Sequence, residues 1–315
     1  MKHRLGLRSL PCLLAWGALV VSPLVMLGCR RSSPSSPAPP PVGRLVQIRV
    51  HERSPASSSV VDATALAARA AERLRTAGVL PVELETPPER GRDYRLDIDV
   101  AFEQSVSGDQ GAMRALVAAR LTRFGAPDAP LVSQALAERA YRRGEAEDAV
   151  AKAGRAHVER ALGDVLQGLL AKLRIHQGDS KQLLAALADA DFDLRAEAVR
   201  VAGLRRERAA VPALCQLLKS EDADLRDLAL GALVEIGDRS AVPALTRAAP
   251  FRDVRELPKI LDAVAALGGD EARAYLEFVA TSHDQETIRE LAREALGRFS
   301  RRHAPPDQGA PAPAP

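Results

Sequence analysis

A repeat of 31 residues constrains the fold of this chain more than any other feature. The segment Val211–Leu214 (VPAL) begins at position 211 and returns at position 242 as Val242–Leu245. Less regular copies extend the pattern to Lys181–Ala188 before it and Ala272–Leu276 after it. A unit of this length is a helix pair that cannot bury its apolar face alone, so successive pairs stack. The sequence therefore predicts an all-α solenoid of about four helix pairs over residues 179–302.

Residues that start and stop helices recur in each unit. Pro212 stands in the first turn of a helix, where a missing backbone N–H costs nothing. Asp193 and Asp224 are predicted to be N-caps, because aspartate binds free N–H groups and favours the positive end of the helix dipole. Gly237 is predicted to stop the second helix in a left-handed conformation. The predicted structural signature comprises Asp193, Arg195, Pro212, Asp224, Arg226, Gly237, Pro243, Gly268 and Arg289.

Arginines recur in the repeat beside the predicted capping positions. The series consists of Arg195, Arg226, Arg255 and Arg289. One interpretation is a ladder that binds anions. The interpretation that we favour is structural, in which each arginine bonds an aspartate of the adjacent repeat or the ends of helices.

The charge of the solenoid argues against a nucleic-acid partner. Residues 179–302 carry 19 Lys and Arg against 22 Asp and Glu, whereas a nucleic-acid-binding domain presents a basic face. A local basic cluster does stand out, at Arg205, Arg206 and Arg208. We treat this cluster as a candidate surface for a protein partner, although a solvated turn explains it as well.

The repeat resembles the HEAT-like repeat, in the short bacterial form first associated with phycobilisome lyases. The residues that carry the resemblance are Asp224–Arg226, Ala229, Gly237–Asp238 and Ala241–Leu245. The resemblance implies a curved right-handed stack that is used for protein binding, and no chemistry by itself. Pro250 and Pro258 depart from the pattern and are expected to bend or shorten the second helix of the third unit.

The first 28 residues have the three parts of a secretory signal. Basic residues precede an apolar run, and Met26–Cys29 ends it. This ending resembles the bacterial lipobox, which implies that Cys29 becomes the lipid-bearing first residue of the mature protein. An uncleaved membrane anchor is the alternative. Arg30, under the enterobacterial sorting rule, implies an outer-membrane destination facing the periplasm.

Residues 29–43 are rich in proline and serine and predict an extended tether, and residues 303–315 predict a disordered tail. Between tether and solenoid, residues 44–178 predict an α+β domain of order β-α-β-β-β-α, with an antiparallel sheet and helices on one face. This order behind a lipobox resembles small periplasmic lipoprotein domains such as the lipopolysaccharide-assembly lipoprotein LptE, and more loosely the N-terminal domain of TolB. The predicted strands are 45–50, 94–106, 112–124 and 131–142, and the predicted helices are 62–77 and 145–175.

Motifs of enzyme chemistry are sparse in this sequence. It contains no nucleophile elbow, P-loop, Gly-rich dinucleotide turn or cysteine pair for a metal. Asp97 and Asp99 form a possible carboxylate pair, and His157–Glu159 has a deaminase spacing, but a solvated strand and a solvated helix face explain them better. Cys215 is interpreted as buried filler. We therefore expect no catalytic residue, no cofactor and no metal.

Together these features predict a lipid-anchored cell-envelope protein that is a non-catalytic scaffold. Its solenoid would bind an unidentified protein partner, and the lipid on Cys29 would reach the membrane. Two alternatives stay open. A lipid or glycolipid carrier would need a hydrophobic cleft between the sheet and its helices. A bilin-lyase-like enzyme accessory would bind a tetrapyrrole, although export disfavours it because bilin attachment is intracellular.

Overall fold

The computed structural model describes residues 43–54, 61–107, 109–142, 147–248 and 253–303. The predicted signal sequence with Cys29, nearly all of the predicted tether and the predicted C-terminal tail lie outside these residues. Among the helices so described, none is long and apolar enough to cross a membrane.

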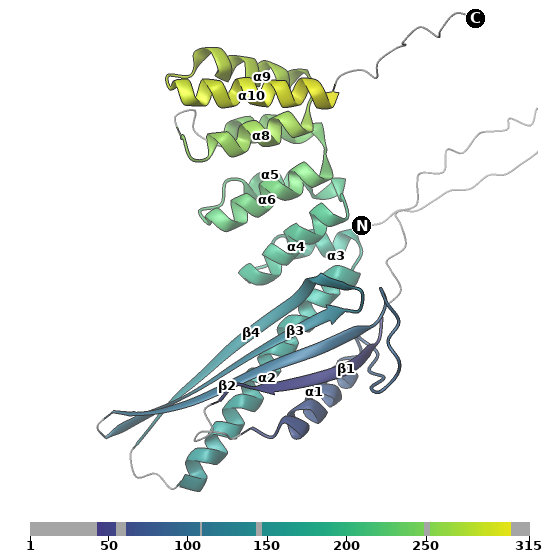
Figure 1. Ribbon diagram of the computed structural model, residues 1–315, viewed down its shortest axis with the longest axis vertical. Helices are drawn as coiled ribbons and strands as arrows, with labels where there is room; N and C mark the ends of the chain where they lie inside the picture. The colour runs from purple at the N-terminus through teal and green to yellow at the C-terminus, as the bar shows by residue number, and fades with distance from the viewer. Residues whose placement is uncertain (1–42, 55–60, 108, 143–146, 249–252, 304–315) are drawn as a thin grey trace, which may run out of the picture. The chain divides into compact units, whose positions relative to one another are not determined.

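The N-terminal region forms a four-stranded sheet with two helices (Figure 1). The element order matches the predicted β-α-β-β-β-α, and the observed strands extend the predicted ones by a few residues. The strands are β1 (Leu45–Glu52), β2 (Tyr94–Ser107), β3 (Gln110–Arg123) and β4 (Ala126–Arg142), and the helices are α1 (Ala63–Ala77) and α2 (Glu147–Gln177).

The sheet is mixed, so the prediction of a wholly antiparallel sheet is wrong at one edge. The strand order is β1-β2-β3-β4, and β1 runs parallel to β2, with Ile48 opposite Leu96 and Val50 opposite Ile98. Helix α1 connects these two strands, and such a crossover returns the chain to the same end of the sheet. The pairs β2–β3 and β3–β4 are antiparallel, as their short connections require.

One face of the sheet packs against both helices, as predicted. Alternate residues of β2, from Leu96 to Phe102, are at most 1% exposed and share one core with Leu66 of α1 and Leu162 of α2. A hollow in this core among leucines of α1, α2, β2 and β3 holds only about 10 Å³, about the least that one water needs. The opposite sheet face carries Leu116 and Leu136, which are 44% and 57% exposed.

The C-terminal region is a run of helix pairs, which confirms the predicted all-α solenoid after the α+β domain (Figure 1). Within the described chain it has four pairs, each of a first and a second helix. Short 3-10 turns at Arg208–Ala210 and Arg239–Ala241 lead into α5 and α7. The pairs are α3 (Ser180–Ala186) with α4 (Phe192–Leu204), α5 (Val211–Leu217) with α6 (Ala223–Ile236), α7 (Val242–Ala248) with α8 (Leu257–Leu267), and α9 (Asp270–Ser282) with α10 (Glu286–His303).

Small residues let the second helices of neighbouring pairs approach closely. Gly203 of α4 faces α6, where an added Cβ would lie 3.1 Å from the Cα of Ala232. Ala198, Ala202 and Ala229 are completely buried in the solenoid core. The core therefore forms from close helix contacts rather than from large side chains.

The predicted stop and start residues mostly behave as expected. Gly237 adopts φ 72° at the end of α6, and its N–H donates to the carbonyl of Leu233. Gly268 also has a positive φ, 77°, after α8. Pro258 occupies the first turn of α8, which begins one residue earlier at Leu257 and is shorter than α4 and α6. The expected shortening of this helix is confirmed, whereas Pro250 lies outside the described residues.

The N-caps differ from the prediction by two residues. Asp191 caps α4 by accepting from the N–H of Leu194 at 3.2 Å, and Asp222 caps α6 through Leu225 at 3.1 Å. Asp193 and Asp224, which the sequence suggested as caps, lie inside the first turn. Capping requires an extended backbone ahead of the helix, and only the earlier aspartates have it.

Replacing the observed and the predicted cap of α6 separates the two assignments. Asp222→Ala should lower the free energy of unfolding by about 1 kcal/mol, because it removes a cap. Asp224→Ala should cost about 0.3 kcal/mol, because it removes only a charge near the helix dipole. Urea unfolding followed by circular dichroism measures both. A larger loss for Asp224→Ala would contradict the structure.

Candidate functional site

The repeat arginines bind backbone carbonyls at the turn inside each helix pair. Nη1 of Arg195 donates to the carbonyl of Asp189 at 2.8 Å, and Nη1 of Arg226 donates to that of Ser220 at 2.9 Å. Arg289 repeats this bond, to the carbonyl of Asp284 at 3.2 Å. Arg255 precedes α8 and lies outside any helix. A structural role therefore holds for three of the four. The predicted bond to an aspartate of the adjacent repeat is wrong, because the partners are backbone carbonyls in the turn of the same pair.

Turns inside the pairs share one edge of the solenoid, which we call the turn edge. It comprises residues 187–193, 218–224 and 253–256 of the first three pairs. Aspartate recurs there every 31 residues, at Asp191, Asp222 and Asp253. The residue after each aspartate is apolar, and two of these, Phe192 and Val254, are 37% and 42% exposed.

Two hollows open along the turn edge, each between two successive pairs among the first three. The first, of about 530 Å³, lies between the first and second pairs and is mainly apolar. The second, of about 250 Å³, lies between the second and third pairs. Equivalent residues line both, one repeat apart: Leu187 with Leu218, Arg195 with Arg226 and Leu217 with Ala248.

The rim of the second hollow is acidic. Asp253 and Glu256 line it together with Asp227, and Asp227 is held at 2.8 Å by Lys259 of the next pair. Glu221 and Asp224 stand on the adjoining turn with exposed side chains. Lys219 and Arg226 also line this hollow, and an arginine that binds a neutral carbonyl keeps its charge. The acidic excess of the edge therefore comes from the carboxylates on its turns.

The basic cluster that the sequence marked as a partner surface is partly structural. Nη1 of Arg205 donates to the carbonyl of Gly178 at 2.7 Å, and Nη2 donates to that of His176 at 2.6 Å. Arg205 thus binds the free carbonyls at the C-terminal end of α2, a common role for arginine. Its assignment to a surface for a protein partner is therefore wrong. Arg206 and Arg208 remain exposed.

A buried carboxylate joins α2 to the first helix pair. Glu197 of α4 is only 8% exposed, and its two oxygens lie 2.7 Å from Nε2 of His176 and 2.7 Å from Nη1 of Arg200. Burial raises the pKa of Glu197, but the hydrogen bond and charge of His176, with the charges of Arg200 and Lys172, outweigh it and lower the pKa. Lys172 also pairs with Asp193 at 3.5 Å.

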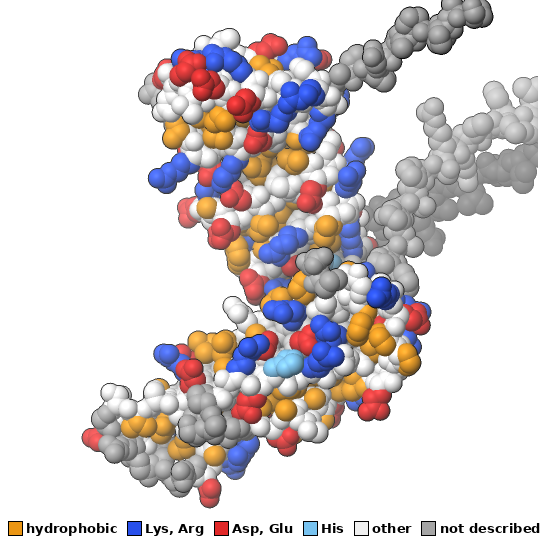
Figure 2. All heavy atoms as spheres, viewed as in Figure 1, with side chains coloured by type: hydrophobic (Ala, Val, Ile, Leu, Met, Phe, Trp, Pro, Cys, Tyr) orange, Lys and Arg blue, Asp and Glu red, His pale blue; other side chains and the backbone are white. Residues whose placement is uncertain are grey.

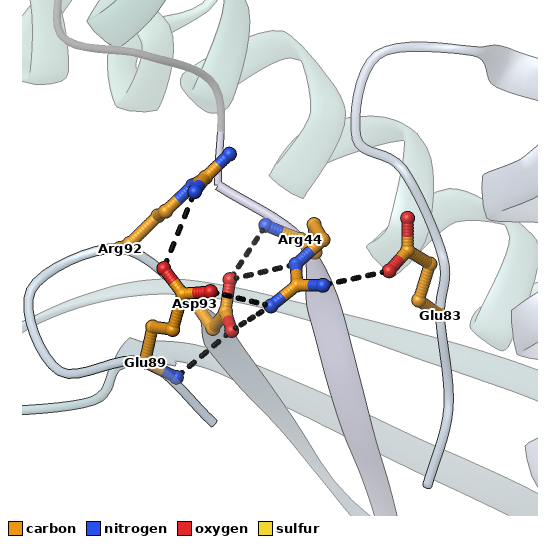
Figure 3. Close-up of polar contacts among 5 residues, drawn as sticks. All are labelled: Arg44, Glu83, Glu89, Arg92 and Asp93. Atoms are coloured by element: carbon orange, nitrogen blue, oxygen red, sulfur yellow. Dashed lines mark hydrogen bonds and ion pairs between the residues drawn. The ribbon is translucent and has the colours of Figure 1, made fainter. Parts of the chain in front are cut away.

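A second polar cluster clamps the start of β1 to β2 (Figure 3). Asp93 is completely buried and accepts from Nη2 of Arg44 at 2.9 Å and from the N–H of Glu89 at 2.9 Å. Arg44 also reaches Glu83 at 2.8 Å. The hydrogen bond from Arg44 lowers the pKa of Asp93. The hydrogen bonds that Arg44 donates to Asp93 and Glu83 raise the pKa of Arg44. No local pattern of residues indicates this cluster, because 49 residues separate Arg44 from Asp93.

The residues considered for enzyme chemistry form ion pairs and hydrogen bonds with neighbouring residues. Asp97 pairs with Arg95 at 2.8 Å and Asp99 with Arg53 at 2.7 Å. His157 is buried rather than solvated, and its Nδ1 lies 2.8 Å from the carbonyl of Ala153. Burial raises the pKa of the Cys215 thiol. Within the described ranges, no group of His, Cys, Asp and Glu is arranged to hold a metal ion.

Residues 180–257 match the family model of HEAT repeats. The predicted HEAT-like character is confirmed for this segment, which includes the turn edge, the first hollow and all lining residues of the second hollow except Ile260. A search of curated proteins found no match to the chain. Figure 2 shows acidic, basic and apolar side chains interspersed over the solenoid on the face drawn.

Three solved structures are similar to parts of the chain. The complex of CpcE and CpcF of phycocyanin lyase from Nostoc sp. PCC7120 has 23% identity and a TM-score of 0.33, covering 43% of this chain and 60% of that chain. A minor lipoprotein from Acinetobacter baumannii has 15% identity and a TM-score of 0.26, covering 41% and 92%. Lipoprotein GNA1162 from Neisseria meningitidis has 15% identity and a TM-score of 0.25, covering 38% and 98%. The chain thus spans about three fifths of the lyase chain.

Acid should weaken the contact between α2 and the first pair. Because the pKa of folded Glu197 lies below its ordinary value of 4.5, its contribution to stability is complete above pH 4.5 and is lost as the pH falls through the lowered pKa. Glu197→Gln should therefore flatten the fall of melting temperature below pH 4.5. Glu290→Gln, at an exposed site of α10, should leave the fall unchanged. Equal pH profiles for all three proteins would contradict this role.

Proposed function

We propose that the protein is a lipid-anchored component of the cell envelope and a non-catalytic scaffold that binds another protein through its solenoid. The observation that carries this proposal is the stack of helix pairs, with its match to HEAT repeats over residues 180–257. Such stacks present long, rigid surfaces, and they use them for binding. Function still depends on a particular surface rather than on the fold.

The membrane address rests on the sequence of the first 30 residues. The signal-like run ending in Met26–Cys29 supports lipidation of Cys29. Arg30 supports an outer-membrane destination facing the periplasm. A proline-rich tether over residues 29–43 would hold the solenoid near the membrane and raise its local concentration, so weak contacts would suffice.

The filled core of the N-terminal domain favours a scaffold over a lipid carrier. A carrier needs a cleft between sheet and helices that holds acyl chains. The leucines of α1, α2, β2 and β3 instead close around a hollow of about 10 Å³. The bilin-accessory alternative has a direct test: tetrapyrrole added to the purified protein would show a shifted absorbance spectrum on binding.

Lipidation of Cys29 predicts incorporation of a fatty-acid probe. An alkyne fatty acid supplied to growing cells should label the wild-type protein and Cys12→Ala equally, because Cys12 lies within the predicted signal. Cys29→Ala should carry no label, since the acceptor thiol is gone. Mass spectrometry should place the mature N-terminus at Cys29. An unlabelled wild-type protein that retains residues 1–28 would instead indicate an uncleaved anchor.

Crosslinking in the native host tests which domain binds the partner. The full mature protein is compared with a form that lacks residues 179–302, both carrying the same affinity tag on the tether. A partner crosslinked to the full protein should disappear with the solenoid. A partner that persists without the solenoid would move the binding activity to the N-terminal sheet.

A further inference from the structure

We propose that the turn edge binds a segment of the partner protein that combines apolar residues with Lys or Arg. This inference rests on the proposed scaffold function and adds a binding surface and the chemistry of its ligand. Three features carry it: hollows that recur with the repeat, apolar side chains exposed beside them, and an acidic rim.

The hollows set the spacing of the apolar residues. They repeat one helix pair apart, with Leu187 and Leu217 in the first replaced by Leu218 and Ala248 in the second. Packed helices lie about 8–10 Å apart. A segment in the polyproline II conformation advances about 3.1 Å per residue and completes a turn every three residues, so apolar side chains three residues apart lie on one face and reach both hollows.

Exposed apolar side chains widen the surface on either side of the hollows. Phe192 begins α4 next to the first hollow, and Val254 stands beside Asp253 at the second. The intervening turn has Ala223 at the equivalent position, so the strip has no bulky side chain at its centre. A ligand segment can therefore lie across the second turn between two apolar contacts.

Charge selects a basic segment. The turn edge carries eight Asp and Glu against two Lys and Arg, counted over residues 187–193, 218–224 and 253–256. Arg195 and Arg226, which line the hollows just beyond these ranges, bring the balance to eight against four. Three of the aspartates, Asp191, Asp222 and Asp253, accept backbone N–H groups there. Complementary charge raises the rate of association and excludes acidic competitors.

A second copy of the chain is the main competing ligand. The turn between the first and second pairs exposes Leu204 beside Arg206 and Arg208, which also combines apolar and basic groups. Docking of that turn on the turn edge of another copy would be head-to-tail and would build open chains of molecules. Sedimentation of the full mature protein distinguishes this case, because Arg206→Glu would then abolish self-association.

The test uses a defined probe and the full mature protein in detergent. The probe is a fluorescent peptide with two leucines three residues apart, flanked by lysines. One control peptide has glutamates for the lysines, and the other has serines for the leucines. Fluorescence anisotropy should show that the protein binds the probe and neither control peptide. The affinity for the probe should fall as salt rises from about 0.05 to about 0.3 M, since salt screens charge.

Variants then place the binding on the turn edge. Glu221→Lys with Asp224→Lys should weaken binding of the probe about tenfold at low salt, because it reverses the rim charge. Glu271→Lys with Glu277→Lys changes the net charge equally on exposed positions of α9, and should change binding less than about twofold. Melting curves exclude unfolding, and the peptide controls on the wild-type protein remain decisive if a variant fails to fold.

Three results would overturn the inference. They are equal binding of the lysine and glutamate peptides, equal loss in both double variants, and self-association abolished by Arg206→Glu. A partner crosslinked in the host to other faces of the solenoid would leave the scaffold function standing and remove the turn edge as its site. Loss of every solenoid crosslink would instead overturn the scaffold function.

Discussion

Helix α2 contributes side chains to both hydrophobic cores of the protein. Leu173 belongs to the core beneath the sheet, and Ile175, two residues later, belongs to the core of the solenoid. Arg205 binds the last carbonyls of α2, and His176 of α2 holds the buried Glu197 of α4. A solenoid needs a cap on each terminal pair, and α2 provides the first cap while its length supports the sheet.

The solenoid repeats a small set of polar contacts around a core of small residues. In each of the first two pairs an aspartate caps the second helix, and an arginine four positions later binds the turn before it. These contacts fix the turns, and fixed turns give the turn edge a regular surface. Glu221 and Asp224 of the second turn stay exposed and add acidic charge to this edge. The same residues that stabilise the repeat therefore determine what the edge can bind.

Periodic features of the structure could be predicted from the sequence. The 31-residue repeat indicated the helix pairs. Gly237 indicated a helix end, because glycine readily adopts the left-handed conformation that ends many helices. The observed caps were also within reach, since Asp191, Asp222 and Asp253 are spaced by the period. The predicted caps Asp193 and Asp224 lie inside the first turn instead, and capping depends on the backbone conformation ahead of the helix.

Contacts between distant residues could not be predicted in this way. The pairing of Arg44 with Asp93, the parallel direction of β1 and the bond of Arg205 to α2 all depend on tertiary packing. A basic cluster such as 205–208 looks the same in sequence whether its arginines bind carbonyls or solvent. The free turn edge and its hollows likewise became apparent only once the pairs were stacked.

Hydrogen exchange in Leu162→Ala tests most directly whether α2 makes the two cores one folding unit. Leu162 lies on the sheet side of α2 and is 1% exposed, so its truncation should cost about 2–5 kcal/mol. If α2 couples the cores, slow amides of α4 and α6 lose the same free energy of protection as those of β3. Loss of protection in β3 with unchanged exchange in α4 and α6 would contradict the account.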